Sequence, residues 1–298
     1  MSRQPTKSEK PQVETTGHEW DGIEEYNNPL PRWWVWVFYA TIVWGVWYTI
    51  AYPAWPLIQR ATAGYSGYST RAEVQADIDA VNAQNASLNT SLADADMNAL
   101  VADPSTELYG YAVNMGRSVF SANCSQCHGA GAAGVQASGF PSLIDDDWLW
   151  GGTIDDIVFT VTNGIRNEQS PDARWVEMPA FGDILSHDEI AAIANHVRQI
   201  SGQDFDAALA DQGTQLFLDN CASCHGDTGD GDRTMGAPRL NDAVWLYGGS
   251  LETIEQTITN ARFGVMPSWS HEWRGASGLD PAEINAVAAY VHQLGGGE

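Results

Sequence analysis

The sequence predicts an all-α protein in which one N-terminal transmembrane helix precedes two tandem domains of one kind. Three observations in the 298-residue chain support this prediction. Residues 33–52 form an uncharged apolar run, the motif Cys-x-x-Cys-His occurs twice, and the residues around the first motif recur 97 positions later. A membrane anchor followed by a duplicated helical unit accounts for all three.

The first predicted element is a membrane-spanning helix over residues 33–52. This run of 20 residues has no charged side chain, and it is long enough to cross a hydrocarbon core of about 30 Å as a helix. Tryptophan and tyrosine are concentrated at both of its ends, as at membrane interfaces. A cleaved signal peptide would have a shorter apolar core and a shorter polar head than residues 1–32, although residues 61–63 (Ala-Thr-Ala) resemble a cleavage site.

The distribution of basic residues predicts the orientation of this helix. Every lysine in the chain, together with Arg3 and Arg32, precedes the span, and basic segments remain on the cytoplasmic side of a membrane. We therefore expect residues 1–32 in the cytoplasm of a bacterium, the span 33–52 in the inner (cell) membrane, and everything that follows in the periplasm.

A linker over residues 53–106 is expected between the span and the first repeat. Its composition is rich in Ala, Asn, Asp and Ser, and Val74, Ile78 and Val81 recur at helical spacing. We expect one or two exposed helices with a packing stripe on one side.

The chain beyond residue 32 is strongly acidic. It contains ten arginines, no lysine and 32 aspartates and glutamates, a net formal charge of −22. This sign excludes nucleic acid as a partner, because a surface that binds nucleic acid must neutralise phosphates. It favours a basic protein partner, such as a cationic donor cytochrome c, which an acidic surface attracts. It suits solubility or adaptation to salt equally well.

The two Cys-x-x-Cys-His motifs predict two covalently bound haem c groups. The motif residues are Cys124, Cys127 and His128 in the first copy and Cys221, Cys224 and His225 in the second. Two thiols one helical turn apart can form thioether bonds with the vinyl groups of a haem, and the histidine that follows binds the iron. Zinc is disfavoured because each cysteine pair has its own histidine and the pairs are 97 residues apart. A disulfide framework or a thioredoxin-like motif fits the sequence no better.

The repeat extends far beyond the motifs. At a shift of 97 residues, Trp148 corresponds to Trp245 and Gly151 to Gly248, and the match resumes near the end of each copy at a shift of 94. Two tandem cytochrome c domains are therefore predicted, over residues 107–202 and 207–298. Each is large enough to fold around one haem.

Four helices are predicted within these domains. They cover residues 107–123, 187–200, 209–220 and 281–294. The first and third deliver the cysteines. Ser186 and Glu189 form a capping box before the second, and Asp280 with Pro281 marks the start of the fourth.

The sixth iron ligands are expected to be Met178 and Met266. Each precedes a proline in the loop before the last helix of its repeat, 50 residues after His128 and 41 residues after His225, respectively. A thioether is a soft neutral ligand that raises the potential of haem iron. This order along the chain assigns Met178 to the first haem and Met266 to the second.

Two other ligands remain open for the second haem. Met235 is the runner-up, although its counterpart in the first repeat is Ser138. His271, five residues after Met266, would give two histidine ligands.

Three segments carry a family resemblance. Residues 21–34 (DGIEEYNNPLPRWW), residues 147–152 (DWLWGG) and the two Met-Pro sites resemble those of subunit III of cbb3-type cytochrome c oxidases, the membrane-anchored dihaem cytochrome c subunit. The resemblance covers almost the whole chain. Residues 129–132 depart from it in lacking the acidic, glycine-rich run of residues 226–231, which leaves the ligands unaffected.

The resemblance implies an electron-transfer subunit that is not itself catalytic. Such a subunit would relay electrons from a donor cytochrome c through two haems to a monohaem cytochrome c subunit and to the haem–copper subunit, which reduces oxygen and pumps protons. Histidine–methionine ligation supports this, because it leaves no open iron position for a substrate. Two other classes stay open: a free-standing membrane-anchored dihaem carrier, and a dihaem peroxidase whose iron would lose its sixth ligand.

Overall fold

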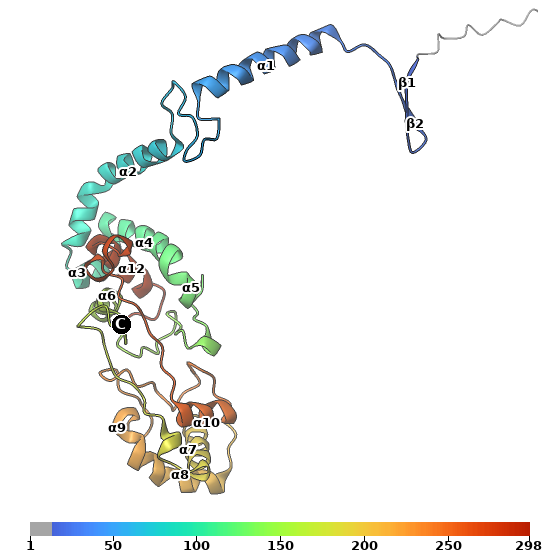
Figure 1. Cartoon of the computed structure of the whole chain (residues 1–298). Helices are drawn as coiled ribbons and strands as arrows, with labels where there is room; N and C mark the ends of the chain where they lie inside the picture. The colour runs from blue at the N-terminus through green and yellow to red at the C-terminus, as the bar shows by residue number, and fades with distance from the viewer. Residues whose placement is uncertain (1–13) are drawn as a thin grey trace, which may run out of the picture. The chain divides into compact units, whose positions relative to one another are not determined.

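The computed structural model describes residues 14–298, which form one unit up to Ala83 and another from Gln84 onwards (Figure 1). The first unit begins with a hairpin of strands β1 (Thr15–Trp20) and β2 (Ile23–Tyr26). Its turn residues Asp21 and Gly22 both have positive φ angles, 51° and 82°, as a two-residue hairpin turn requires. The hairpin was not predicted from the sequence, although Asp-Gly is a usual signal for such a turn.

Helix α1 (Arg32–Ala51) confirms the predicted apolar helix to within one residue at each end. It starts directly after Pro31, and its one buried residue is Ala51. Among residues 14–298, α1 is the one helix that is long and apolar enough to cross a membrane. Its exposed tryptophans, tyrosines and aliphatic side chains therefore suit a lipid environment or another membrane subunit.

The linker is helical, as expected, and consists of α2 (Thr70–Ala93) and α3 (Met97–Ala102). The predicted stripe of Val74, Ile78 and Val81 is about half exposed. The end of the linker is different. Leu92, with residues of α3, is buried in the core that surrounds the first Cys-x-x-Cys-His motif.

The second unit contains the four predicted helices and several shorter ones. The helices are α4 (Glu107–Val119), α5 (Ser125–His128), α6 (Ile154–Asn163), α7 (His187–Ile200), α8 (Ala207–Asn220), α9 (Ala222–His225), α10 (Leu251–Asn260), α11 (His271–Arg274) and α12 (Pro281–His292). Both capping boxes form, on Ser186 with Glu189 and on Asp280 with Glu283. The first predicted helix ends earlier than expected, because a π-helical turn over Phe120–Cys124 follows α4.

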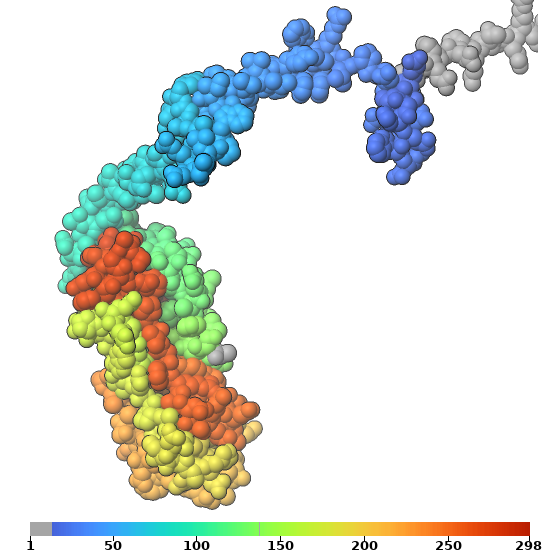
Figure 2. Space-filling view, in the orientation of Figure 1, coloured from blue at the N-terminus to red at the C-terminus, as the bar shows by residue number. Residues whose placement is uncertain are grey.

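The helices pack across the two repeats. Helix α12, at the end of the second repeat, packs against α4 and α6 of the first, whereas α7 of the first repeat packs against α8 and α10 of the second. Figure 2 shows the red C-terminal segment lying against the green segment of the first repeat. Gly116 on α4 and Gly213 on α8 are equivalent positions where the helices touch. A side chain on either glycine would overlap the partner backbone, at Ala286 or at Ala192.

Helices of both predicted domains, 107–202 and 207–298, therefore contribute to each packing unit. One core joins residues of the segment 92–161 to residues of the segment 266–294, and the other lies between residues 178 and 258. We call them the outer module and the inner module, because the inner module is inserted into the chain of the outer one. The six-residue connection between α7 and α8 explains the pairing, since a short connection keeps consecutive helices adjacent.

Candidate haem-binding sites

Each motif histidine is oriented by a backbone carbonyl 13 residues further along the chain. His128 Nδ1 lies 3.1 Å from the carbonyl oxygen of Pro141, and His225 Nδ1 lies 2.9 Å from that of Pro238. A carbonyl can only accept, so Nδ1 must carry the proton. Nε2 is then the free nitrogen and can bind iron.

Burial keeps both imidazoles neutral. It lowers the pKa of His128 and of His225 below the ordinary value, and the hydrogen bonds to the proline carbonyls oppose this only in part. A neutral imidazole is the form that binds a metal.

The first cysteine of each motif is not a reactive thiolate in the protein chain. Burial, together with the neighbouring Cys127 or Cys224, raises the pKa of Cys124 and of Cys221 to about 11. A redox-active cysteine of the thioredoxin type needs a depressed pKa. The thiols therefore match structural attachment points better than a thiol–disulfide centre.

The cavity next to His128 is largely apolar and belongs to the outer module. Its lining includes Cys124 and Leu143 from the first repeat, Met266 from the loop before α11, and Val287 from α12. Met266 was expected to face His225. It lies instead beside the other histidine, because the chain after residue 264 returns to the outer module.

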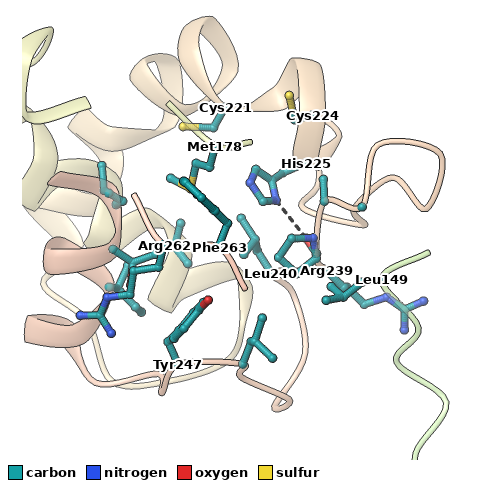
Figure 3. Close-up of a pocket in the computed structure, with 18 of the residues that line it drawn as sticks. Leu149, Met178, Cys221, Cys224, His225, Arg239, Leu240, Tyr247, Arg262 and Phe263 are labelled. Carbon is teal, nitrogen blue, oxygen red and sulfur yellow. Dashed lines mark hydrogen bonds between the residues drawn. The ribbon is translucent and has the colours of Figure 1, made fainter. Parts of the chain in front are cut away.

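The cavity next to His225 belongs to the inner module (Figure 3). Cys221, Cys224 and His225 lie together at one end of it, with Met178 beside the histidine ring and Tyr247 at the opposite end. Met178 was expected to face His128. The structure thus brings both methionines to the expected kind of site but exchanges their partners.

The two alternative ligands predicted for the second haem, Met235 and His271, lie in different surroundings. Met235 does line the cavity of His225, so it competes there with Met178 and not with Met266. His271 lines neither cavity in the described part of the chain, and its Nδ1 lies 3.2 Å from the Leu279 carbonyl oxygen.

An unpaired donor supports the fit of a haem to the outer cavity. The indole Nε1 of Trp150 is buried and has no hydrogen-bond partner among residues 14–298. A buried donor without a partner is costly, and a haem carries two propionate carboxylates that can accept such a bond. The hydroxyl of Tyr247, at the equivalent position of the second repeat, lines the other cavity. The donor set of each site therefore suits haem c.

The two cavities are neighbours across a reciprocal interface. Trp150 lies against Gly236 and Tyr247 lies against Gly139, and in both places a side chain on the glycine would overlap the ring. The two glycines are equivalent in the repeat, and both have positive φ angles, 63° and 70°. Leu149 lines both cavities, and Figure 3 shows it entering the inner one from a separate chain segment.

Two of these features, the reciprocal interface and Arg166, were not predicted from the sequence. The repeat of Trp-Leu-Trp at 148–150 as Trp-Leu-Tyr at 245–247 was a usable signal for the interface. Arg166, which lines the inner cavity, gave no signal, because its counterpart in the second repeat is Phe263.

Comparisons with known proteins agree with this architecture. Three family models match in succession: the N-terminal domain of cytochrome oxidase-cbb3, FixP, over residues 12–59; cytochrome c oxidase, cbb3-type, subunit III, over residues 112–197; and cytochrome c, over residues 210–295.

Similar full-length proteins bear the same description. The chain is 54% identical to the cbb3-type cytochrome c oxidase subunit CcoP of Cereibacter sphaeroides and 51% identical to that of Rhodobacter capsulatus, with 100% of each chain covered. It is 46% identical to the FixP subunit of Rhizobium meliloti over 96% of both chains. The chain therefore belongs to the CcoP/FixP family of cbb3-type cytochrome c oxidase subunits.

Proposed function

We propose that the axial ligands of the two haem c groups are His128 with Met266 in the outer module and His225 with Met178 in the inner module. The observation that carries this proposal is the crossed pairing of the cavities: Met266 lies with His128, and Met178 lies with His225. Met235 also lines the inner cavity, but Met178 is the one followed by a proline, as Met266 is. The thiols of the two motifs attach the haems covalently.

The chain is the electron-transfer subunit of a cbb3-type oxidase and carries two covalently bound haem c groups. When bound, these groups supply one-electron redox chemistry. A histidine and a methionine that both bound the iron would leave it no open position for a substrate. Relay is therefore the role of this chain, and oxygen reduction belongs to a partner subunit.

The surroundings of the subunit follow from its charge and its anchor. Helix α1 would hold the protein in the inner membrane, with residues 1–32 in the cytoplasm and both haem modules in the periplasm. Residues 21–34 would contact the other oxidase subunits. Electrons would enter from a basic donor cytochrome c and leave towards the monohaem and haem–copper subunits.

Purification and oxygen uptake test this relay. We expect the haem–copper subunit to co-purify with the chain in mild detergent. Oxygen uptake driven by a reduced cytochrome c should fall in Met178→His and in Met266→His, because loss of the thioether lowers the potential of one relay site. Met115→Leu is the control, since Met115 lies on α4 and lines neither cavity. A chain that purifies alone, or peroxide reduction that rises when Met178 is replaced, would contradict the proposal.

A further inference from the structure

Arg166 lies where the two methionine segments approach each other. The chain leaves α6 at Gly164 and turns at Arg166, which has a positive φ of 50°, an uncommon conformation for any residue other than glycine. The turn is followed by the segment that carries Met178. The segment that carries Met266 back to the outer module lies beside this turn, because Ile165 pairs in antiparallel fashion with Met266.

The guanidinium of Arg166 bonds to both segments. Its Nε donates to the carbonyl oxygen of Gly264 at 2.7 Å, and its Nη1 donates to the carbonyl oxygen of Val176 at 2.8 Å. Each acceptor lies two residues before a methionine, Met266 and Met178 respectively. The planar fork of arginine can hold two acceptors at fixed positions, which the single ammonium of lysine cannot reproduce.

Arg166 forms no salt bridge with an acid of the described part of the chain. Within residues 14–298 no carboxylate lies within 4.0 Å of Arg166. Its guanidinium instead lies 5.8 Å from the ring centroid of Phe263. The nitrogens are therefore available to the two carbonyls. Burial lowers the pKa of Arg166, and the more distant carboxylate of Glu177 opposes this only in part.

The two segments depend on Arg166 to different degrees. Over residues 14–298, the bond to Val176 is the only hydrogen bond to the backbone of residues 175–179. The backbone of Met266, by contrast, makes three hydrogen bonds that do not involve Arg166. Two are with Ile165, at 2.9 and 3.0 Å, and Asn167 Nδ2 donates the third at 3.1 Å.

We propose that Arg166 is a positioning residue shared by both axial methionines, so that one side chain supports ligation at both haem sites. This inference rests on the crossed ligation proposed above. Loss of the two guanidinium hydrogen bonds should loosen the Met178 segment most and the Met266 segment to a smaller but measurable extent. Arg166 lines only the inner cavity, so a loss of methionine ligation at the outer site must travel through the Gly264–Met266 segment. A charge acts on a redox potential over a longer distance, so the charge-transfer band is the measurement that decides for the outer site.

The test uses the full-length protein within its oxidase complex, with haem content measured first. In Arg166→Gln we expect both haems to lose part of the sulfur-to-iron charge-transfer absorption that reports methionine ligation, and both midpoint potentials to fall. A tenfold weaker preference of methionine for reduced over oxidised iron lowers a one-electron potential by about 59 mV. The shift should be larger for the haem attached at Cys221 and Cys224.

Two further variants separate the fork from the charge. Arg166→Lys keeps the charge but not the fork, so we expect it to stay impaired at both sites. If Arg166→Gln fails to take up haem, the same measurements on Arg166→Lys test the inference. Arg262→Gln is the matched control, because Arg262 lines the same cavity and stacks on Tyr247 at 5.5 Å without joining the two segments. It should lower only the potential of the inner site and leave both charge-transfer bands in place.

Three results would overturn the inference. They are unchanged bands in Arg166→Gln, a change confined to the inner site, or full recovery in Arg166→Lys. Replacement of Met178 and Met266 themselves keeps the two proposals distinct. If those replacements leave the bands in place, the crossed ligation fails. If they remove the bands while Arg166→Gln does not, only the shared support fails.

Discussion

In each site, single residues orient the histidine that would bind the metal. The carbonyl groups of Pro141 and Pro238 fix the tautomer of the two histidines, and burial keeps both rings neutral. These hydrogen bonds matter for ligation, because a bond at the ring nitrogen that does not face the metal fixes the direction of the ring and raises its basicity as a ligand.

Asp147 is a residue whose environment opposes its charge. It lines the outer cavity. Burial, and then the nearby carboxylate of Asp242, raises its pKa to about 6, while Arg239 and Arg233 counteract this in part. A carboxyl that is harder to ionise in the folded than in the unfolded protein destabilises the fold wherever it is ionised.

Asp147→Asn should therefore stabilise the protein in a pH-dependent way. The raised pKa means that the folded state binds the proton more tightly, so stability is highest below about pH 4 and falls as the pH rises through about 4 to 6. A shift of about two units corresponds to about 3 kcal/mol, which partial exposure reduces to about 1–2 kcal/mol. We expect thermal unfolding of the variant to show this gain at pH 7 and none at pH 4. Asp146→Asn, at an exposed neighbour, is the control, and an equal gain of Asp147→Asn at both pH values would contradict the account.

At the scale of elements, the crossing of α4 and α12 joins the two ends of the outer module. Phe120 and Tyr290 pack there with ring centroids 5.5 Å apart, and Phe217 and His196 occupy the equivalent place between α8 and α7 at 5.1 Å. Gly116 makes the first crossing possible, because a Cβ there would meet the carbonyl of Ala286.

Two glycines on α4 should therefore respond oppositely to the same change. Gly116→Ala should destabilise the protein by about 1–3 kcal/mol, because a forced overlap in a packed contact costs that much. Gly110→Ala has open space around its Cβ and should stabilise it by about 0.5–1 kcal/mol through helix propensity. Thermal unfolding followed by circular dichroism measures both. Equal shifts of the same sign would show that the α4–α12 contact is not tight.

The elements were predictable from sequence to a much greater degree than their partners. The capping signals at Ser186 and Asp280 predicted the starts of α7 and α12 correctly, since such signals act locally. The pairing of helices was not predictable from the repeat, because α7 and α12 present equivalent apolar faces and either could cover α4. The short connection between α7 and α8 is the sequence feature that decides which helices pair. For the same reason the methionines were predicted as residues, while their assignment to one histidine or the other was not.

On the scale of the whole molecule, the inner module is inserted into the outer one and the two cavities adjoin. Trp150 and Tyr247 cross the boundary in opposite directions, and Leu149 borders both sites. The two cavities therefore lie within one folded unit of the chain.

The acidic surface should affect how fast electrons enter this relay. With a net charge of −22 beyond residue 32, association with a basic cytochrome c is expected to be fast at low salt and slower as salt screens the attraction. Stopped-flow reduction of the purified complex at rising ionic strength measures this, with an acidic cytochrome c as control. A rate that does not depend on ionic strength would leave the acidic residues a role in solubility alone.

The crossed ligation is tested most directly in variants that retain one covalent haem. Cys124→Ser with Cys127→Ser leaves the haem attached at Cys221 and Cys224, and its midpoint potential and sulfur-to-iron charge-transfer band are measured after replacement of each methionine. We expect Met178→His to lower this potential and abolish the band, and Met266→His to leave both unchanged. Loss of the band in Met266→His, with the band retained in Met178→His, would contradict the crossed ligation.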